Sequence, residues 1–159
     1  MKNLIETFYT ALNDSDGKTM ASCYHDDVVF EDPAFGVLHG EKAKSMWLML
    51  CESQNGKGFK VQFSNITTNN NEGSAHWEAF YTFSKTGRQV HNKIDASFEF
   101  KDGLIIKHTD VFDLHKWAKQ AIGLKGMLFG GMSFFKKKLN TQTNSLLEKY
   151  MEKKNSLIN

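Results

Sequence analysis

Three side chains have the types and positions to carry acid–base chemistry: Asp32, His108 and Asp110. Asp32 ends the apolar run "VVFED" at 28–32 and precedes Pro33, the only proline of the chain. A carboxylate that enters an apolar cavity loses water, so its pKa rises and it becomes a better base near neutral pH. An aspartate before a turn can equally accept hydrogen bonds from the amides of that turn. Spacing alone leaves both interpretations of Asp32 open.

The segment "KHTDVFD" at 107–113 gives a second signal. Alternate residues of a strand share one face, so His108, Asp110 and Phe112 should point the same way. Buried charges are rare without partners. The pair is therefore either a structural hydrogen bond or a proton-handling dyad, in which His108 donates a proton to a developing enolate or orients it.

Asn92 and Ile94 begin the longest run of alternating apolar residues, and Asn92 is a polar group in an otherwise apolar wall. His91 and Asp95 fall on the opposite face, toward solvent or a subunit contact. His76 is also expected on an outward strand face, with a structural role.

Metal and cofactor sites have no support in the spacing of residues. A metal needs three or four converging ligands, and no HxH or HxxxH pair occurs. No phosphate-binding loop, dinucleotide fingerprint or serine elbow is present either. We expect no metal and no cofactor.

Two periods of hydrophobicity predict the elements that position these residues. Helical spacing is expected over about 5–12, 43–50 and 113–123, with a short helix that Asp16 caps and that runs through Tyr24. Strands are expected at 28–32, 59–63, 77–83, 92–100 and 104–112, with a long polar loop at 67–74. Helices followed by a meander of four long strands predict an α+β domain with a curved antiparallel sheet.

Residues 124–159 are predicted to be a C-terminal helical extension of a domain at 1–123. Its apolar face could cover a cavity mouth, pack on a second subunit or rest on a membrane surface. The residues of that face are Phe135, Leu139, Leu146, Leu147 and Tyr150.

Composition narrows the classes of partner. The net charge is +2, and lysine supplies all the basic residues except Arg88, with one cluster at 136–138. Nucleic-acid surfaces favour arginine and a concentrated basic stripe, so nucleic acid is not an expected partner. Cys23 and Cys51 form no CxxC motif, and no signal peptide or membrane span is predicted. We expect a cytoplasmic protein with two free thiols.

Two longer stretches resemble a known superfamily. They are "FYTALNDSDGKTMASCYHDDVVFEDPAFGVLHGEKAKSMW" at 8–47 and "TGRQVHNKIDASFEFKDGLIIKHTDVFDLHKWAKQAIG" at 86–123. Over about residues 3–123 the chain is similar to the nuclear transport factor 2-like superfamily, which includes ketosteroid isomerase and the SnoaL-like polyketide cyclases. The resemblance implies a cone-shaped, cystatin-like α+β barrel with a deep apolar pocket and a homodimer through the outer face of the sheet.

The resemblance also bears on single residues. "FEDP" places Asp32 at the position of the catalytic base of the isomerase. Phe8, however, occupies the position of the oxyanion-hole tyrosine of the isomerase, and Ala96 lies near the position of its protonated aspartic acid. Steroid isomerisation is therefore not expected. The epoxide hydrolase branch uses an Asp-Arg-Asp trio, and the sole Arg88 lies beside a hairpin turn. The cyclase branch has an acidic residue on the pocket wall, often on the last strand, with a His or Asn nearby. His108, Asp110 and Asn92 are closer to that pattern.

We expect the pocket to bind a small apolar, ring-containing molecule that bears a carbonyl. The chain could move a proton in it, as isomerases and cyclases do, or it could be a non-catalytic binding module or a dimerising interaction domain. The expected catalytic residues are Asp32, Asp110 and His108. The expected ligand-binding residues are Phe8, Tyr9, Trp47, Trp77, Tyr81, Asn92, Ile94 and Phe112.

Overall fold

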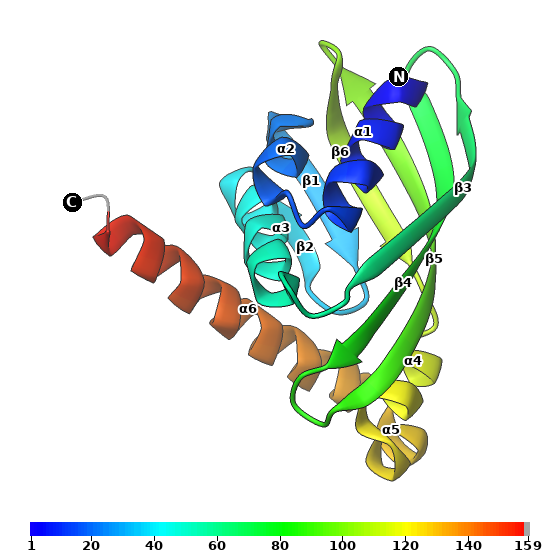
Figure 1. The fold of residues 1–159 in the computed structure, drawn as a ribbon, viewed down its shortest axis with the longest axis vertical. Helices are drawn as coiled ribbons and strands as arrows, with labels where there is room; N and C mark the ends of the chain where they lie inside the picture. The colour runs from blue at the N-terminus through cyan, green and yellow to red at the C-terminus, as the bar shows by residue number, and fades with distance from the viewer. Residues whose placement is uncertain (158–159) are drawn as a thin grey trace.

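A curved, unclosed sheet of six strands wraps around the N-terminal helices in the computed structural model, which describes residues 1–157 (Figure 1). The helices are α1 (Lys2–Asn13), α2 (Gly17–Ser22), α3 (Glu41–Gln54), α4 (Leu114–Ile122), α5 (Leu124–Phe129) and α6 (Ser133–Ser156). The strands are β1 (Tyr24–Asp32), β2 (Gly36–His39), β3 (Lys60–Thr68), β4 (Glu72–Phe83), β5 (Arg88–Lys101) and β6 (Leu104–Val111). The predicted α+β class with a curved sheet and a C-terminal helix is confirmed.

The strand order is β2-β1-β6-β5-β4-β3. Neighbouring strands are antiparallel except β1 and β6, which pair in parallel. The parallel pair brings the end of β1, with Asp32, beside the strand that carries His108 and Asp110, because Phe30 and His108 are register partners. Two segments that lie far apart in sequence thus deliver the acidic residues to one place.

The start of β1 corrects one expectation. Asp16 caps α2 as predicted, since its carboxylate accepts the Thr19 N–H at 3.0 Å, but α2 ends at Ser22 rather than at Tyr24. Tyr24 instead begins β1, where it is the register partner of Ile105. The pairing with β6 gives this backbone a partner outside the helix and so ends the helix early.

Two further strand boundaries differ from the prediction. No strand is predicted for β2, yet its four residues pair with β1, with His39 opposite Val29. The expected loop at 67–74 is shorter, because Thr67 pairs with Ser74 and their hydroxyls lie 2.8 Å apart. Polar side chains on the exposed face of a strand pair give no apolar alternation, so they read as a loop in the sequence.

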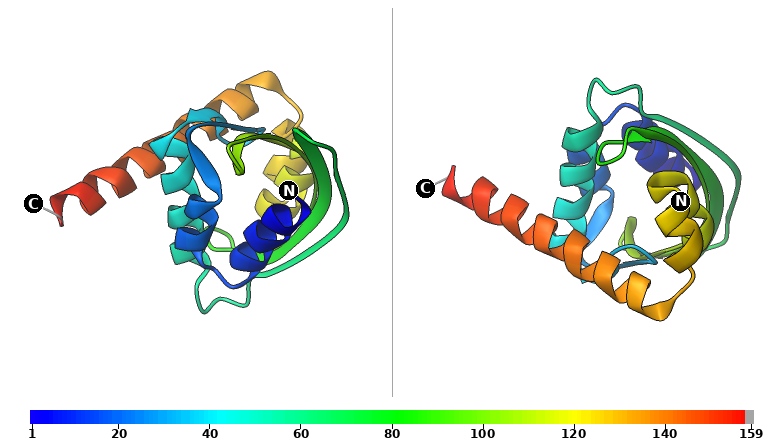
Figure 2. Two further views of the ribbon diagram at one scale, coloured as in Figure 1. Left: turned by 90° about the horizontal axis from the view of Figure 1, so that it is seen from above. Right: turned by 90° about the horizontal axis from the view of Figure 1, so that it is seen from below.

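The C-terminal helices also depart in part from expectation. Asp113 caps α4 by accepting the Lys116 N–H at 2.9 Å, and Gly123 ends it with a φ of 74°, so α4 lies within the range predicted to be helical. The short helix α5 lies at the start of the predicted helical extension, although no separate helix is predicted there. The tail helix α6 is confirmed and has 24 residues. It crosses the open side of the cone and continues beyond the body (Figure 2).

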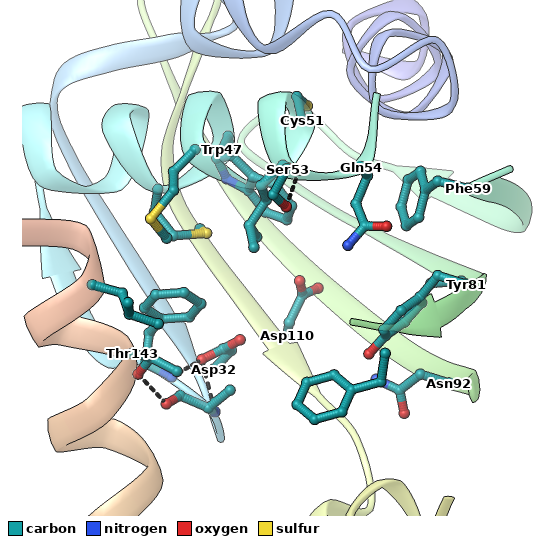
Figure 3. Close-up of a pocket in the computed structure, with 18 of the residues that line it drawn as sticks. Asp32, Trp47, Cys51, Ser53, Gln54, Phe59, Tyr81, Asn92, Asp110 and Thr143 are labelled. Atoms are coloured by element: carbon teal, nitrogen blue, oxygen red, sulfur yellow. Dashed lines mark hydrogen bonds between the residues drawn. The ribbon is translucent and has the colours of Figure 1, made fainter. Parts of the chain in front are cut away.

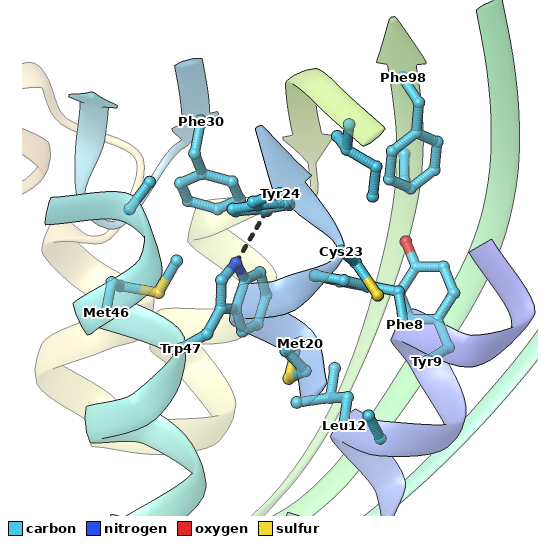
Figure 4. Close-up of a cluster of buried hydrophobic side chains, with 14 of the residues drawn as sticks. Phe8, Tyr9, Leu12, Met20, Cys23, Tyr24, Phe30, Met46, Trp47 and Phe98 are labelled. Atoms are coloured by element: carbon cyan, nitrogen blue, oxygen red, sulfur yellow. Dashed lines mark hydrogen bonds between the residues drawn. The ribbon is translucent and has the colours of Figure 1, made fainter. Parts of the chain in front are cut away.

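The core fills the space between the concave face of the sheet and helices α1 to α3. Phe8, Tyr9, Tyr24, Phe30 and Trp47 are all almost fully buried there (Figure 4). The ring of Phe8 contacts three of the others, with centroid distances of 5.4 to 5.5 Å. This aromatic layer borders a cavity, because Phe30 and Trp47 also line it.

Candidate functional site

A cavity of about 640 Å³ lies between the sheet, α3, α4 and α6. Its wall is mainly apolar and aromatic, with a few polar groups that face inward (Figure 3). Six of the eight expected ligand-binding residues line it: Trp47, Trp77, Tyr81, Asn92, Ile94 and Phe112. A volume of this size suits a small-molecule ligand of one to a few rings.

Asp32 and Asp110 line the same cavity, at the ends of β1 and β6. Asp32 Oδ1 accepts the backbone N–H groups of Ala34 and Phe35 at 2.9 and 2.6 Å. Burial raises the pKa of the Asp32 carboxyl to about 7. The hydrogen bond from the Phe35 N–H opposes this rise, and the charge of Asp110 adds to it. Glu31, one residue earlier, is exposed. Asp32 therefore combines the two interpretations: it accepts hydrogen bonds from the turn, and it lines the cavity.

A chain of buried hydrogen bonds holds Asp110. Trp77 Nε1–H donates to Asp110 Oδ1 at 3.1 Å, and His108 Nε2 lies 3.0 Å from the same oxygen. On the other side of the imidazole, His108 Nδ1 lies 2.7 Å from the Tyr24 hydroxyl, which accepts Trp47 Nε1–H at 2.8 Å. Burial raises the pKa of Tyr24 well above its ordinary value, so its O–H is retained. When the Tyr24 O–H donates to Nδ1, the imidazole donates from Nε2 to Asp110.

His108 lies behind Asp110 rather than at the cavity wall. Its side chain is fully buried, and it is absent from the cavity lining. Both ring nitrogens are engaged in the chain of hydrogen bonds. The expectation that His108 donates a proton to a ligand is corrected on this ground: its position allows it to orient Asp110.

Phe8 and Tyr9 are likewise placed in the core and not at the cavity wall. The alternation of helical faces predicted that both are buried but could not separate core from cavity. The Tyr9 hydroxyl is buried with no hydrogen-bond partner among residues 1–157. Phe8 packs edge-on against Trp47, 5.4 Å between centroids.

Two further polar groups face the cavity and can meet a ligand. The Tyr81 hydroxyl accepts Trp117 Nε1–H at 2.8 Å, and burial raises its pKa, so its own O–H remains available to donate. Gln54, at the end of α3, lines the cavity with a buried Oε1 that has no partner in the described part of the chain. Tyr81 is among the ligand-binding residues expected from the sequence. Gln54 is not, because a glutamine near a helix end carries no pattern of its own.

The helix α6 forms one side of the cavity, through Leu139, Thr143, Leu146 and Tyr150 among others. Of the three roles foreseen for the tail, this geometry corresponds to covering the cavity mouth. Leu147, on the inner side of α6, is fully buried.

The same helix also forms hydrogen bonds with the turn that follows Asp32. Asn140 Nδ2–H donates to the carbonyl oxygens of Pro33 and Ala34 at 3.0 and 2.6 Å. Asn144 Nδ2–H donates to the Phe35 carbonyl at 2.8 Å. These contacts hold in place the segment whose N–H groups bind the Asp32 carboxylate. No pattern in the sequence predicts them.

The remaining titratable residues of interest lie outside the cavity. His76 and Asp95 are paired on the outer face of the sheet, 2.7 Å apart, and His91 bonds Glu78 there. Arg88 donates from Nε to the Gln120 carbonyl at 2.7 Å and does not line the cavity.

Within residues 1–157, no group of three or more His, Cys, Asp or Glu side chains is arranged to hold a metal ion. None of the helices described is at once long enough and apolar enough to cross a membrane.

Comparison with known proteins places this geometry in a family. The sequence model of the family described as "SnoaL-like domain" matches residues 5–108. No curated protein sequence matches the chain.

Several solved structures share the fold. A candidate polyketide cyclase from Xanthomonas campestris pv. campestris is 20% identical, with 75% of this chain and 94% of that chain covered and a TM-score of 0.60. An LEH-like epoxide hydrolase from M. tuberculosis is 24% identical, with 80% and 89% covered and a TM-score of 0.58. A protein with a ketosteroid isomerase-like fold from Catenulispora acidiphila, solved with trimethylamine, is 9% identical, with 74% and 91% covered and a TM-score of 0.62. At these identities the likeness concerns the fold, on which many activities are built.

Proposed function

Because this chain belongs to the SnoaL-like domain family, within the nuclear transport factor 2-like superfamily, we propose that its cavity binds a small apolar carbonyl compound and moves a proton in it. The observation that carries this proposal is a carboxyl with a pKa of about 7 in a mainly apolar cavity. A base of that strength is half ionised near neutral pH, where it can both take up and return a proton.

Asp32 is the proposed base. Its Oδ1 is committed to the turn, whereas Oδ2 accepts no hydrogen bond from residues 1–157. Oδ2 would take a proton from the carbon next to the carbonyl, and the C–H electron pair would move toward the carbonyl oxygen. The Asp32 carboxyl would then return a proton to a carbon of the ligand, and in D₂O this can be a deuteron that the carboxyl has exchanged with solvent. The turn thus holds the carboxylate in place while one oxygen remains for the reaction.

The developing enolate oxygen needs a hydrogen-bond donor, since such donors often supply the largest part of the catalytic effect. Phe8 stands where the related isomerase has its tyrosine. We assign the donor role instead to the Tyr81 hydroxyl, which Trp117 Nε1–H polarises from behind. Gln54 and Asn92 supply further amide groups that line the cavity.

Asp110 is proposed as a second, electrostatic carboxylate rather than a second base. Oδ1 accepts two N–H groups from His108 and Trp77, which keep it rigid. Its charge raises the pKa of Asp32. His108 is then a positioning residue, because it acts on the ligand only through Asp110.

The exchange of deuterium at the carbons next to the carbonyl of 2-tetralone tests this proposal, with NMR detection in D₂O. The wild-type protein should accelerate the exchange over buffer. Asp32→Asn keeps the oxygen that accepts from the turn but removes the base, and should slow exchange by about 100-fold or more. Equal rates in the wild type and the variant would contradict the role of Asp32.

A non-catalytic binding module is the second candidate. The observation that favours it is the closed network around Asp110, in which the N–H groups of Trp77 and His108 are already used and cannot meet a ligand. In that case 2-tetralone should bind, as seen by perturbed cavity resonances, and show no accelerated exchange.

We also propose a homodimer through the outer face of the sheet. Phe80 stacks on His91 there, 4.2 Å between centroids, beside the ion pairs of His76 and Glu78. A mixture of aromatic and paired polar groups is usual for protein interfaces. Sedimentation equilibrium should show a dimer that Phe80→Glu dissociates, while Lys85→Glu, on an exposed hairpin, should leave it unchanged. A monomeric wild type at micromolar concentration rules the dimer out.

The cytoplasmic location remains part of the proposal. Cys23 and Cys51 are both buried and free, as expected for a chain kept in a reducing compartment. Imaging of a tagged full-length chain would test it, and a secreted product would contradict it.

A further inference from the structure

The surface of α5 and the first turn of α6 gathers exposed apolar side chains. Among the described residues, six of the eleven exposed large hydrophobic side chains lie between residues 124 and 134. They are Leu124, Met127, Leu128, Phe129, Met132 and Phe134. Leu124 is 75% and Leu128 62% exposed, and the rings of Phe129 and Phe134 lie 6.0 Å apart. We call these six residues the 124–134 patch.

The packing of α5 explains why its large side chains face outward. Gly126 lies against α4 so closely that a Cβ there would come within 1.9 Å of the Ala118 carbonyl oxygen. At Gly130 a Cβ would lie 2.6 Å from the Ala118 Cβ. His115 Nε2–H also donates to the Met127 carbonyl at 2.7 Å and so ties α5 to α4. The glycine face is thus the packed face, and the apolar face is left to solvent at the end of the molecule remote from the N-terminus (Figure 1).

The segment that carries the patch is basic. Residues 114–147 contain six lysines and no aspartate or glutamate. Since the whole chain has a net charge of +2, this segment carries +6 and the remaining residues carry −4. The lysines are Lys116, Lys119, Lys125, Lys136, Lys137 and Lys138, and all six are exposed.

We propose that the 124–134 patch docks on the surface of an anionic lipid bilayer. The apolar side chains would enter the interface between headgroups and acyl chains, and the lysines would meet the lipid phosphates. A second copy of the same patch is a poorer partner, because two segments of +6 would then face each other. Exposed apolar patches with a polar rim mark this kind of surface.

Docking would also place the cavity beside the lipid. Trp117 and Leu139, which belong to the same basic segment, line the cavity. An apolar ligand could then pass between bilayer and cavity with little exposure to water. The docking itself does not depend on the reaction proposed for Asp32.

Co-sedimentation of the full chain with vesicles tests the electrostatic part. The chain should bind vesicles of phosphatidylcholine with about 30% phosphatidylserine, bind pure phosphatidylcholine much less, and be released by salt. Lys137→Gln with Lys138→Gln should weaken binding by about 25-fold, at about fivefold per lysine. The matched control, Lys57→Gln with Lys60→Gln, removes two exposed lysines outside the segment and should leave binding unchanged.

A second pair of variants tests the apolar part. Leu124→Ser with Leu128→Ser should weaken vesicle binding by about tenfold or more, since both side chains would enter the interface. Val111→Ser removes a side chain that is 61% exposed on β6 and should have no effect. The proposal is overturned if the wild type ignores anionic vesicles at low salt, or if neither patch variant weakens binding. Self-association that these serine variants abolish, without vesicle binding, would make the patch an interface between copies and also overturn it.

Discussion

Asp32 shows how one carboxylate serves a turn and a cavity together. Oδ1 accepts two backbone N–H groups, and the side chain still lines the cavity with a pKa of about 7. The sequence posed these two roles as alternatives, because spacing cannot tell one carboxylate oxygen from the other. Strand alternation puts Glu31 on the face opposite to Asp32, and Glu31 is exposed while Asp32 points inward.

Tyr24 and Tyr9 offer a matched test of the hydrogen-bond chain. Tyr24→Phe leaves Trp47 Nε1–H without an acceptor and His108 Nδ1 without a donor, and should lower the free energy of unfolding by about 1 to 3 kcal/mol. Tyr9 is equally buried, but its hydroxyl has no partner within residues 1–157, so Tyr9→Phe should cost little or stabilise. Urea unfolding of both variants measures the difference.

Equal losses in the two tyrosine variants would show that volume rather than hydrogen bonding governs these sites. The sequence could not have predicted the link from Tyr24 to His108, because 84 residues separate them. A contact of that range depends on the parallel pairing of β1 and β6, which follows from the tertiary fold alone.

At the scale of elements, α6 holds the segment that presents Asp32. Asn140 and Asn144 donate to the carbonyls of Pro33, Ala34 and Phe35. Asn140→Ala with Asn144→Ala should loosen this turn, so that the amides of Ala34 and Phe35 exchange about tenfold faster or more. Hydrogen exchange followed by NMR measures this directly.

The control for this prediction lies on the same helix. Thr141→Ala with Ser145→Ala changes two exposed residues of α6 that do not contact the turn. If the amides of Ala34 and Phe35 exchanged at the same rates in both double variants, the claim that α6 stabilises the turn would be refuted.

The elements that could be predicted are those in which apolar residues recur with a clear period along the sequence. α1, α3, α4, β5 and β6 bury one clear face, and their positions were expected. β2 has only four residues and one fully buried side chain, and α5 packs through glycines, so neither produces a pattern. Such elements exist because a neighbour supplies their partners, which local sequence does not encode.

At the scale of the whole molecule, the fold is compatible with several activities, and the residues that line the cavity decide between them. Among the structures that share the fold is an LEH-like epoxide hydrolase. Arg88 lies outside the cavity here, so the Asp-Arg-Asp trio of the epoxide hydrolase branch has no counterpart. The boundary between residues 1–123 and the extension stays a prediction, although α6 lines the cavity and so contributes to the site.

The pH dependence of deuterium exchange into 2-tetralone tests the central claim most directly. Asp32 acts as a base only when ionised, and its pKa is raised to about 7. The rate with the wild-type protein should therefore rise with pH and level off above a midpoint near 7, and Asp32→Asn should abolish this rise. A rate no faster than buffer at every pH, or the same profile in Asp32→Asn, would contradict the assignment of Asp32 as the base of this cavity.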